Sequence, residues 1–179
     1  MQKILKFWLN RGASGFRIDA TPHLYEVEQD AKGYIPDEPL SGTTANKEEW
    51  NYLSHVHTVD KIENIHLIYQ FREILDEHQK LNGGVTRFIF FHIPLFVRNM
   101  FIFFRVIMTE AYSPINVVMQ YYGDGKRNGS HIPFNFKLLE LLSNSSSAFD
   151  YQQIIGIWMN NMPAGRSANW VVNNYNRNS

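Results

Sequence analysis

Two carboxylate side chains, Asp19 and Glu110, each end a short segment that has the residue pattern of a β-strand. Residues 15–20 alternate apolar and polar side chains, and residues 106–111 begin with a β-branched, apolar run. The carboxyl ends of parallel strands share one edge of a sheet, and α/β barrels build their active sites at that edge. Two carboxyl groups placed there can hydrolyse a glycoside with retention, because one attacks the anomeric carbon while the other protonates the leaving oxygen.

A third side chain, Arg17, lies two residues before Asp19, so both point to the same face of a strand. A guanidinium at this position could hold Asp19 ionised through a charge-assisted hydrogen bond, as a carboxylate nucleophile requires. The same spacing also fits a structural ion pair at a strand end that does no chemistry. The spacing alone leaves both interpretations open.

The surrounding chain alternates strand and helix patterns, which is typical of an α/β fold with parallel strands. Asp60 with Glu63 predicts a capping box, and Ser113 with Pro114 predicts the start of a later helix. Residues 30–58 show no sustained period and predict a long loop, of a length that is usually functional or disordered. Helices are predicted at residues 3–10, 60–82, 114–122 and 150–162, and two further strands at residues 132–138 and 169–172.

Residues 88–104 form a nearly apolar block that breaks this alternation. The block is shorter than the roughly 20 apolar residues that a membrane-spanning helix needs. Polar groups and a proline interrupt it at His92, Pro94, Arg98 and Asn99, and charge is costly inside a bilayer. No transmembrane span is favoured, while a buried strand pair and an inserted segment both remain open.

Charge and cysteine content exclude several classes of function. Lys plus Arg and Asp plus Glu each number 17, so no strong field favours nucleic acid as a partner. The chain has no cysteine, which excludes a disulfide framework, a cysteine-ligated zinc cluster and a thiol nucleophile. No metal site is predicted from the histidines, because no helical i, i+4 pairing links His23, His55, His57 or His131.

The N-terminus and two glycosylation signals bear on localisation. Residues 1–9 have the pattern of an amphipathic helix, with too short an apolar run for a secretory signal peptide. N-glycosylation sequons begin at Asn128 and Asn144. We therefore expect a glycoprotein of a secreted class whose chain, as given, lacks a signal peptide.

Several motifs, in order, resemble those of glycoside hydrolase family thirteen, the α-amylase family, in its insect maltase (α-glucosidase) form. The nucleophile strand of that family is similar to Gly15-Phe16-Arg17-Ile18-Asp19-Ala20, followed by Pro22-His23-Leu24-Tyr25-Glu26. The strand that carries its general acid is similar to Met108-Thr109-Glu110-Ala111-Tyr112-Ser113-Pro114. Two further matches are residues 131–136 and 158–170, and the similarity runs from Met1 to about Val172 apart from residues 88–104.

This resemblance implies a partial (β/α)8 TIM barrel, in which residues 1–179 form an incomplete α-amylase-type catalytic domain covering roughly strands 4 to 7. It implies Asp19 as the nucleophile, Glu110 as the acid/base and Arg17 as the residue that orients the nucleophile. The implied activity is release of glucose from α-1,4-linked oligosaccharides by a retaining double displacement. Small α-glucosides such as maltose or sucrose are the implied substrates, and the parent family is secreted or extracellular and membrane-associated.

No cofactor is expected, and calcium is an alternative. Some barrel amylases bind calcium beside the loop that follows the nucleophile, and Asp30, Asp37 and Glu38 lie in that loop here. Their oxygen atoms suit a hard cation. The same three side chains also fit a solvated loop face, which we take as their expected role.

The sequence departs from the family pattern at three places. The third carboxylate of the family lies in an Asn-His-Asp triplet, where this chain has Tyr175 and Asn176, and an amide cannot supply the negative charge that stabilises the transition state. Residues 88–104 separate a Gly-Gly-x-Thr-Arg turn from the strand that follows it directly in relatives, which predicts a translated intron. The strands matched in this chain do not include the first three strands or the eighth strand of the family's barrel. The edges of the partial barrel would then be exposed, which predicts self-association.

These departures lead us to expect an α-glucosidase-type protein that is inactive as this chain alone. Two alternatives remain open. The first is a catalytically dead α-amylase-like binding protein, similar to a receptor or to the ectodomain of an amino-acid transporter heavy chain. The second is the product of a non-functional gene fragment.

Overall fold

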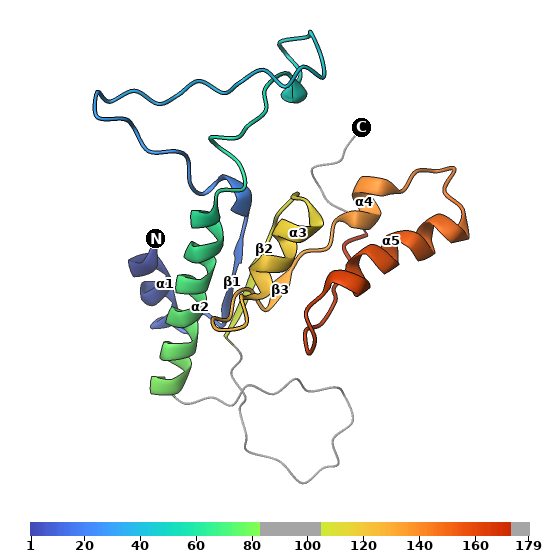
Figure 1. Ribbon diagram of the computed structural model, residues 1–179. Coiled ribbons are helices and arrows are strands. Elements are labelled where there is room, and N and C mark those ends of the chain that lie inside the picture. The colour runs from blue at the N-terminus through green and yellow to red at the C-terminus, as the bar shows by residue number, and fades with distance from the viewer. Residues whose placement is uncertain (83–104, 173–179) are drawn as a thin grey trace.

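A three-stranded parallel sheet forms the centre of the protein, and its strands lie side by side in chain order (Figure 1). The computed structural model describes residues 1–82 and 105–172, and the predictions for residues 88–104, Tyr175 and Asn176 lie outside them. The strands are β1 (Gly15–Ile18), β2 (Val106–Thr109) and β3 (Ile132–Pro133). Arg17 pairs with Met108, and Met108 pairs with Ile132. This arrangement confirms the predicted α/β class and the partial barrel.

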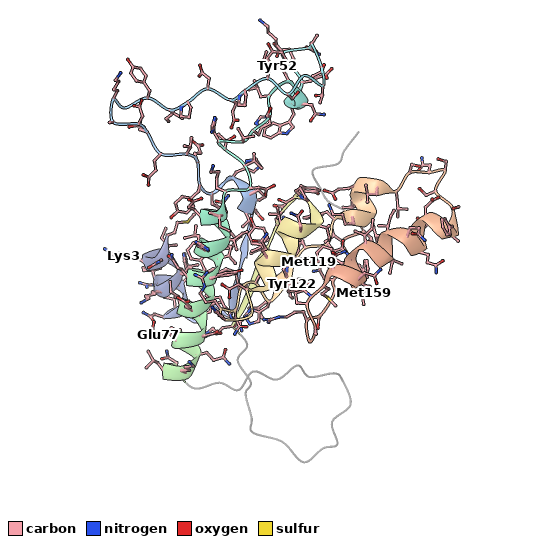
Figure 2. All side chains as sticks on the ribbon, in the orientation of Figure 1. Lys3, Tyr52, Glu77, Met119, Tyr122 and Met159 are labelled. Atoms are coloured by element: carbon pink, nitrogen blue, oxygen red, sulfur yellow. The ribbon has the colours of Figure 1, made fainter. Side chains whose placement is uncertain are left out.

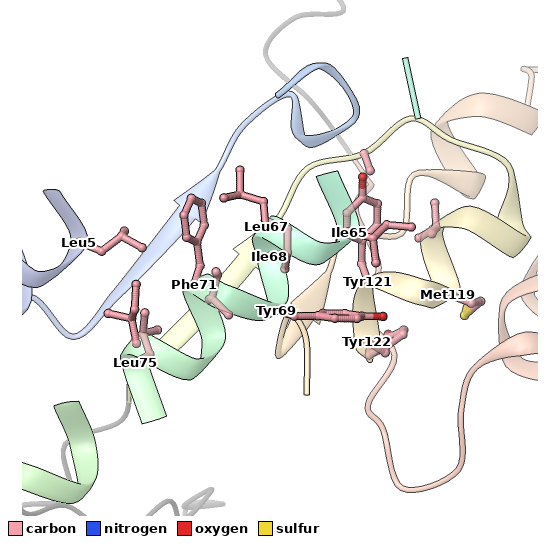
Figure 3. Close-up of a cluster of buried hydrophobic side chains, with 14 of the residues drawn as sticks. Leu5, Ile65, Leu67, Ile68, Tyr69, Phe71, Leu75, Met119, Tyr121 and Tyr122 are labelled. Carbon is pink, nitrogen blue, oxygen red and sulfur yellow. The ribbon is translucent and has the colours of Figure 1, made fainter. Parts of the chain in front are cut away.

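Helix α2 (Ile62–Asn82) is the crossover that returns the chain from the end of β1 to the start of β2. Its buried face carries Ile65, Ile68, Phe71 and Leu75, which recur at helical spacing as the sequence predicts. This face packs against the sheet and against Leu5 of helix α1 (Gln2–Leu9), and Figure 3 shows the shared core. Each fully buried side chain of this kind contributes about 1.5–3 kcal/mol.

The connection from β2 to β3 extends the same core. Helix α3 (Ile115–Val118) continues as a 3-10 helix, η3 (Met119–Tyr122), and ends at Gly123 as predicted. Tyr69 of α2 donates a hydrogen bond from its hydroxyl to the carbonyl of Gln120, at 2.6 Å. Tyr122 lies edge-on to Trp158, with 6.4 Å between ring centroids. Figures 2 and 3 show Met119 and Tyr122 inside this region of the core.

Two helices, α4 (Lys137–Leu141) and α5 (Ala148–Asn161), follow β3. Helix α5 begins with a capping box, in which Ser147 accepts from the backbone N–H of Asp150 and the Asp150 carboxylate accepts from that of Ser147. None of the helices in the described ranges is both long enough and apolar enough to cross a membrane.

Two strand predictions are wrong, the first in its extent and the second altogether. The strand predicted at residues 132–138 ends at Pro133, because α4 begins at Lys137. The strand predicted at residues 169–172 does not form, although that segment lies beside β3. The side chain of Asn169 donates to the carbonyl of Pro133 and accepts from the backbone N–H of Asn135, so a side-chain amide replaces ladder hydrogen bonds.

Several helix starts also differ from the prediction, and α5 begins at Ala148, two residues before the predicted start. Helix α2 begins at Ile62, and Asp60 has a left-handed backbone with φ of 55° instead of a capping conformation. Helix α3 begins one residue late, with Pro114 as its N-cap. The physical reason is that the two expected capping side chains bind each other, because the Ser113 hydroxyl donates to the Asp60 carboxylate at 2.6 Å.

The predicted long loop is confirmed, and it projects from the carboxyl end of β1 (Figure 1). It contains one short 3-10 helix, η2 (Trp50–Tyr52), and Figure 2 shows Tyr52 far from the buried Tyr122. An isolated antiparallel bridge between Leu40 and Leu53 joins its two arms. At its base the Glu38 carboxylate accepts from the backbone N–H of His57, at 2.9 Å. These contacts give the loop a defined path.

Candidate active site

One guanidinium group binds both predicted catalytic carboxylates at the carboxyl edge of the sheet. Arg17 Nε lies 2.5 Å from Asp19 Oδ1, and Arg17 Nη2 lies 3.2 Å from Glu110 Oε2. The arrangement follows from the register, because β1 and β2 are parallel neighbours and Ile18 pairs with Thr109. The residues after each strand, Asp19 and Glu110, therefore emerge together. The structure thus brings the three predicted site residues into one cluster.

The two carboxylates differ in their exposure to solvent. The Glu110 side chain is 10% exposed, whereas the Asp19 side chain is 59% exposed. A nearly buried carboxylate needs a compensating charge, and Arg17 supplies it. Partial burial lowers the pKa of Arg17, but the hydrogen bonds to Asp19 and Glu110 outweigh burial and raise it overall. Arg17 therefore stays charged, which is what two adjacent carboxylates require of their shared partner.

Backbone hydrogen bonds fix how the chain leaves each strand. The backbone N–H of Glu110 donates to the carbonyl of Ile18, and that of Thr21 donates to the carbonyl of Glu110, each at 2.9 Å. Between them Ala20 adopts the left-handed region with φ of 47°, a conformation that costs a non-glycine residue about 1–3 kcal/mol. The turn directly after Asp19 is therefore held against β2 in spite of local strain, and such strain is commonly found at functional sites.

Three aromatic rings extend from the ion-pair cluster along the same edge. The guanidinium carbon of Arg17 lies 5.2 Å from the ring centroid of Phe134, which follows β3. Phe134 is edge-on to Phe136 at 5.9 Å, and Phe136 stacks on Tyr112 at 4.1 Å. Sequence reasoning assigned no role to these rings. The signal that could have identified them is their position after β2 or β3, because residues that follow the strands supply the side chains at this edge of the sheet.

Polar contacts behind the site hold the segment after β2. Besides donating to Asp60, Ser113 has its carbonyl bound by the Lys137 ammonium group at 3.2 Å. Lys137 also pairs with Glu140 at 2.5 Å. These contacts connect the residues that follow Glu110 to the start of α2 and to α4. The Glu110 segment is thus attached on two sides.

Two of the three carboxylates that the calcium alternative involves, Asp30 and Glu38, accept hydrogen bonds from within the long loop. The Asp30 carboxylate accepts from the backbone N–H groups of Lys32 and Tyr34, at 2.8 and 2.9 Å. The pKa of Glu38 is lowered overall, because hydrogen bonds from Thr58 and His57 outweigh the opposing effect of burial. Within residues 1–82 and 105–172, no three acidic or histidine side chains gather into a metal site.

The comparisons with known proteins agree on one family. The model of the alpha amylase catalytic domain matches residues 1–178. Maltase A1 of Drosophila melanogaster is 42% identical over 178 residues, which cover 98% of this chain and 28% of that protein. A salivary alpha-glucosidase of Aedes aegypti is 34% identical, with coverage of 99% and 27%. The chain therefore spans just over a quarter of the length of these relatives.

A solved structure shows the same fold. The crystal structure of an alpha-glucosyl transfer enzyme, XgtA, superposes with a TM-score of 0.59 at 18% sequence identity. The superposition covers 94% of this chain and 26% of that one. The parallel sheet and its helices thus form a segment of a known fold.

Proposed function

The chain belongs to the α-amylase catalytic-domain family, and on that premise we propose that Asp19, Glu110 and Arg17 form the core of a retaining α-glucosidase site. The observation that carries the proposal is the single guanidinium bound to both carboxylates at the ends of adjacent parallel strands. The substrates we propose are small α-glucosides such as maltose or sucrose. Support comes from the relatives, which are named maltases and alpha-glucosidases.

In the first step, the ionised Asp19 attacks the anomeric carbon and forms a glucosyl ester. Protonated Glu110 gives its proton to the glycosidic oxygen, so the carbon–oxygen bond breaks and the aglycone leaves as an alcohol. Arg17 orients Asp19 through their 2.5 Å contact. The attack therefore starts from a carboxylate that is already held in place.

In the second step, ionised Glu110 takes a proton from water while the water oxygen attacks the anomeric carbon. The ester bond to Asp19 breaks, and glucose leaves with its original configuration. The 3.2 Å contact between Arg17 and Glu110 suits this step, because it holds the Glu110 carboxylate in position while it accepts the proton. Arg17 is thus a positioning residue for both half-reactions.

We propose that this chain alone turns over slowly or not at all. It spans just over a quarter of its relatives, and Asn176 stands where the family pattern has a carboxylate. An amide there would leave the oxocarbenium-like transition state without its third negative charge. Restoring Asn176→Asp in a background that supplies the rest of the barrel should raise activity.

The test uses the chain alone and a hybrid in which it replaces the matched segment of Maltase A1. Turnover of p-nitrophenyl α-glucoside is measured with Asp19→Asn as the blank. Glu110→Ala supplied with azide should form α-glucosyl azide, since azide then attacks the glucosyl ester. Asp19→Ala supplied with azide should form the β-anomer by direct displacement. Turnover that survives in Asp19→Asn, or a reversed pair of anomers, would show that the assigned roles are wrong.

We also propose that the chain associates with a second copy of itself through the open edge of β1. Within the described residues β1 pairs only with β2, and the neighbouring helix α1 exposes Ile4, Phe7 and Trp8. Open strand edges and apolar patches favour association. Light scattering coupled to size exclusion should give a dimer mass, and a monomer mass at every concentration would exclude this proposal.

An extracellular location is our proposal for the protein's site of action. One relative is named a salivary alpha-glucosidase, and both sequon asparagines, Asn128 and Asn144, are exposed. Asn144 lies in the turn between α4 and α5, a surface position of the kind that carries N-linked glycans. Chain made in insect cells through the secretory pathway should lose mass on peptide N-glycosidase treatment, and Asn144→Gln should reduce that loss. An unchanged mass would count against it.

A further inference from the structure

The indole of Trp50 is a large exposed aromatic surface within the long loop after β1. The residue is 63% exposed, although one of its faces is covered. The ring of His55 stacks on that face, with 3.5 Å between centroids and an interplanar angle of 6°. The exposed surface therefore lies on the parts of the residue that His55 does not cover.

Local hydrogen bonds fix this ring pair in place. His55 Nε2 lies 2.9 Å from the carbonyl oxygen of Trp50, and His55 takes the left-handed backbone conformation with φ of 53°. The carbonyl of the next residue, Asn51, accepts hydrogen bonds from the hydroxyls of Ser41 and Thr43. Because the platform is already ordered, a ligand that binds to it pays little for immobilising it.

A third ring connects the platform to the nucleophile segment. His23 meets Trp50 edge-on, with 6.0 Å between centroids and an interplanar angle of 78°. His23 belongs to the 3-10 helix η1 (Thr21–His23), which begins two residues after Asp19. The backbone of Thr21 is bonded to the carbonyl of Glu110. The indole therefore lies beyond the same edge of the sheet as the carboxylates. The contact with His23 and the short turn after Asp19 connect it to them.

We propose that the exposed face of Trp50 is a carbohydrate subsite that stacks on a pyranose ring of the substrate beyond the bond cleaved at Asp19. This inference rests on the proposed function and names a binding residue for longer substrates. A pyranose presents C–H groups on its faces, which suit an indole, and hydroxyls around its rim. Asn46 and Glu49, joined by a 3.2 Å hydrogen bond, come just before Trp50 and offer amide and carboxylate partners for such hydroxyls.

The test measures binding directly on the 179-residue chain, labelled with 5-fluorotryptophan and observed by fluorine NMR. Maltotriose should shift the Trp50 resonance in a saturable way, and glucose should do so only at much higher concentration. The resonance is assigned by its loss in Trp50→Phe. Trp8 is the matched control, since it is 50% exposed and edge-on to Phe7 but lies on helix α1.

Trp50→Ala should weaken maltotriose binding about tenfold, and His55→Ala should weaken it less, because the indole would lose only its support. Trp8→Ala should leave the affinity unchanged. Circular dichroism of each variant verifies that the fold is retained. The proposal is overturned if maltotriose shifts no indole resonance, if it shifts Trp8 as strongly as Trp50, or if folded Trp50→Ala binds normally.

The Asp19→Asn chain separates this proposal from the proposed function. Stacking on Trp50 does not require the nucleophile, so maltotriose should still shift the Trp50 resonance in that variant. Binding that persists where the azide products fail to form would support the subsite and contradict the catalytic roles. Correct azide products without a Trp50 shift would support catalysis and contradict the subsite.

Discussion

The ring of Phe134 supports Arg17 by a cation–π contact, and this is the side chain whose loss we expect to disturb the site most selectively. We predict that Phe134→Leu loosens Arg17 without unfolding the protein, at a cost of about 1 kcal/mol. The Nε–H signal of Arg17 in proton–nitrogen NMR should exchange faster with water. Phe7→Leu is the matched control, because Phe7 lies under Arg11 at 3.5 Å on helix α1. Equal effects of both changes on Arg17 would contradict the prediction.

His131 makes the free energy of unfolding depend on pH. Burial, aided by the positive charges of Arg72 and Arg166 against the opposing charge of Asp76, lowers its pKa to about 4. The unfolded chain has an ordinary histidine pKa near 6.5, so between about pH 6.5 and 4 it binds a proton that the folded protein does not bind. The stabilising contribution is therefore complete above about pH 6.5 and is lost as the pH falls towards 4.

His131→Gln should flatten this dependence. The backbone N–H of Ile107 donates to His131 Nδ1 at 3.2 Å, and a glutamine carbonyl offers the same acceptor without titrating. Urea denaturation at pH 7 and pH 5 provides the measurement. The difference in unfolding free energy between the two pH values should be smaller in the variant. An identical difference would mean that His131 does not carry the effect.

At the residue level, the sequence predicted where the site residues lie better than it predicted which residues they contact. Asp19 and Glu110 could be placed because a strand pattern ends at each, and parallel neighbours share an edge. The contact of Arg17 with Glu110 could not be predicted, since it depends on the register between β1 and β2. The same holds for the approach of Phe134 to Arg17, which requires β3 as the third neighbour.

Among the elements, the pairing of β1 with β2 depends on a residue without a side chain. A Cβ on Gly15 would lie 2.4 Å from the carbonyl oxygen of Val106, its partner in the sheet. Gly15→Ala should therefore push the strands apart, cost about 1–3 kcal/mol and weaken the site above them. Thermal unfolding and the Arg17 Nε–H signal measure these two effects.

Gly156 in the middle of α5 is the matched control. A Cβ there meets only the side chain of Asn160, at 3.8 Å, and alanine favours a helix over glycine. Gly156→Ala should raise the free energy of unfolding by about 0.5–1 kcal/mol. If both substitutions changed stability in the same direction, the close approach at Gly15 would not be the controlling contact.

Element types followed from the residue pattern, whereas some element ends did not. The periodic apolar face of α2 and the stop before Pro163 were sufficient for the two long helices. The segment at residues 169–172 has a strand pattern, yet Asn169 binds β3 through its side chain. A pattern of apolar residues does not report which groups make the hydrogen bonds, so such segments are predicted as strands.

For the whole molecule, the contacts of Arg105 indicate how short the connection between the end of α2 and the start of β2 could be. Arg105 Nε lies 3.3 Å from His78 Nδ1 in the last part of α2, and Arg105 Nη1 binds the carbonyl of Ala13 at 3.0 Å. Arg105 Nε–H donates to His78 Nδ1, and burial together with the nearby Arg105 charge lowers the pKa of His78. The start of β2 is thus anchored beside the end of α2.

We predict that deleting residues 88–104 leaves the described fold intact, because loops between a helix and a strand commonly need only about 2–6 residues. The amide NMR signals of β1, β2 and α2 should keep their positions, and less protein should aggregate. Loss of these signals would show that the segment is required. Separately, transcripts that retain codons 88–104 in mature message would contradict the prediction of a translated intron.

The order of β1, β2 and β3 along the chain is also the order in which the ribosome synthesises them. Arg17 and Asp19 leave the ribosome long before Glu110, and a parallel partner for β1 exists only after the crossover helix has been made. During that interval the nascent chain carries an arginine with one carboxylate partner instead of two. The proposed catalytic pair is therefore complete only after β2 has been translated, and a chain cut short within the crossover would carry Asp19 without Glu110.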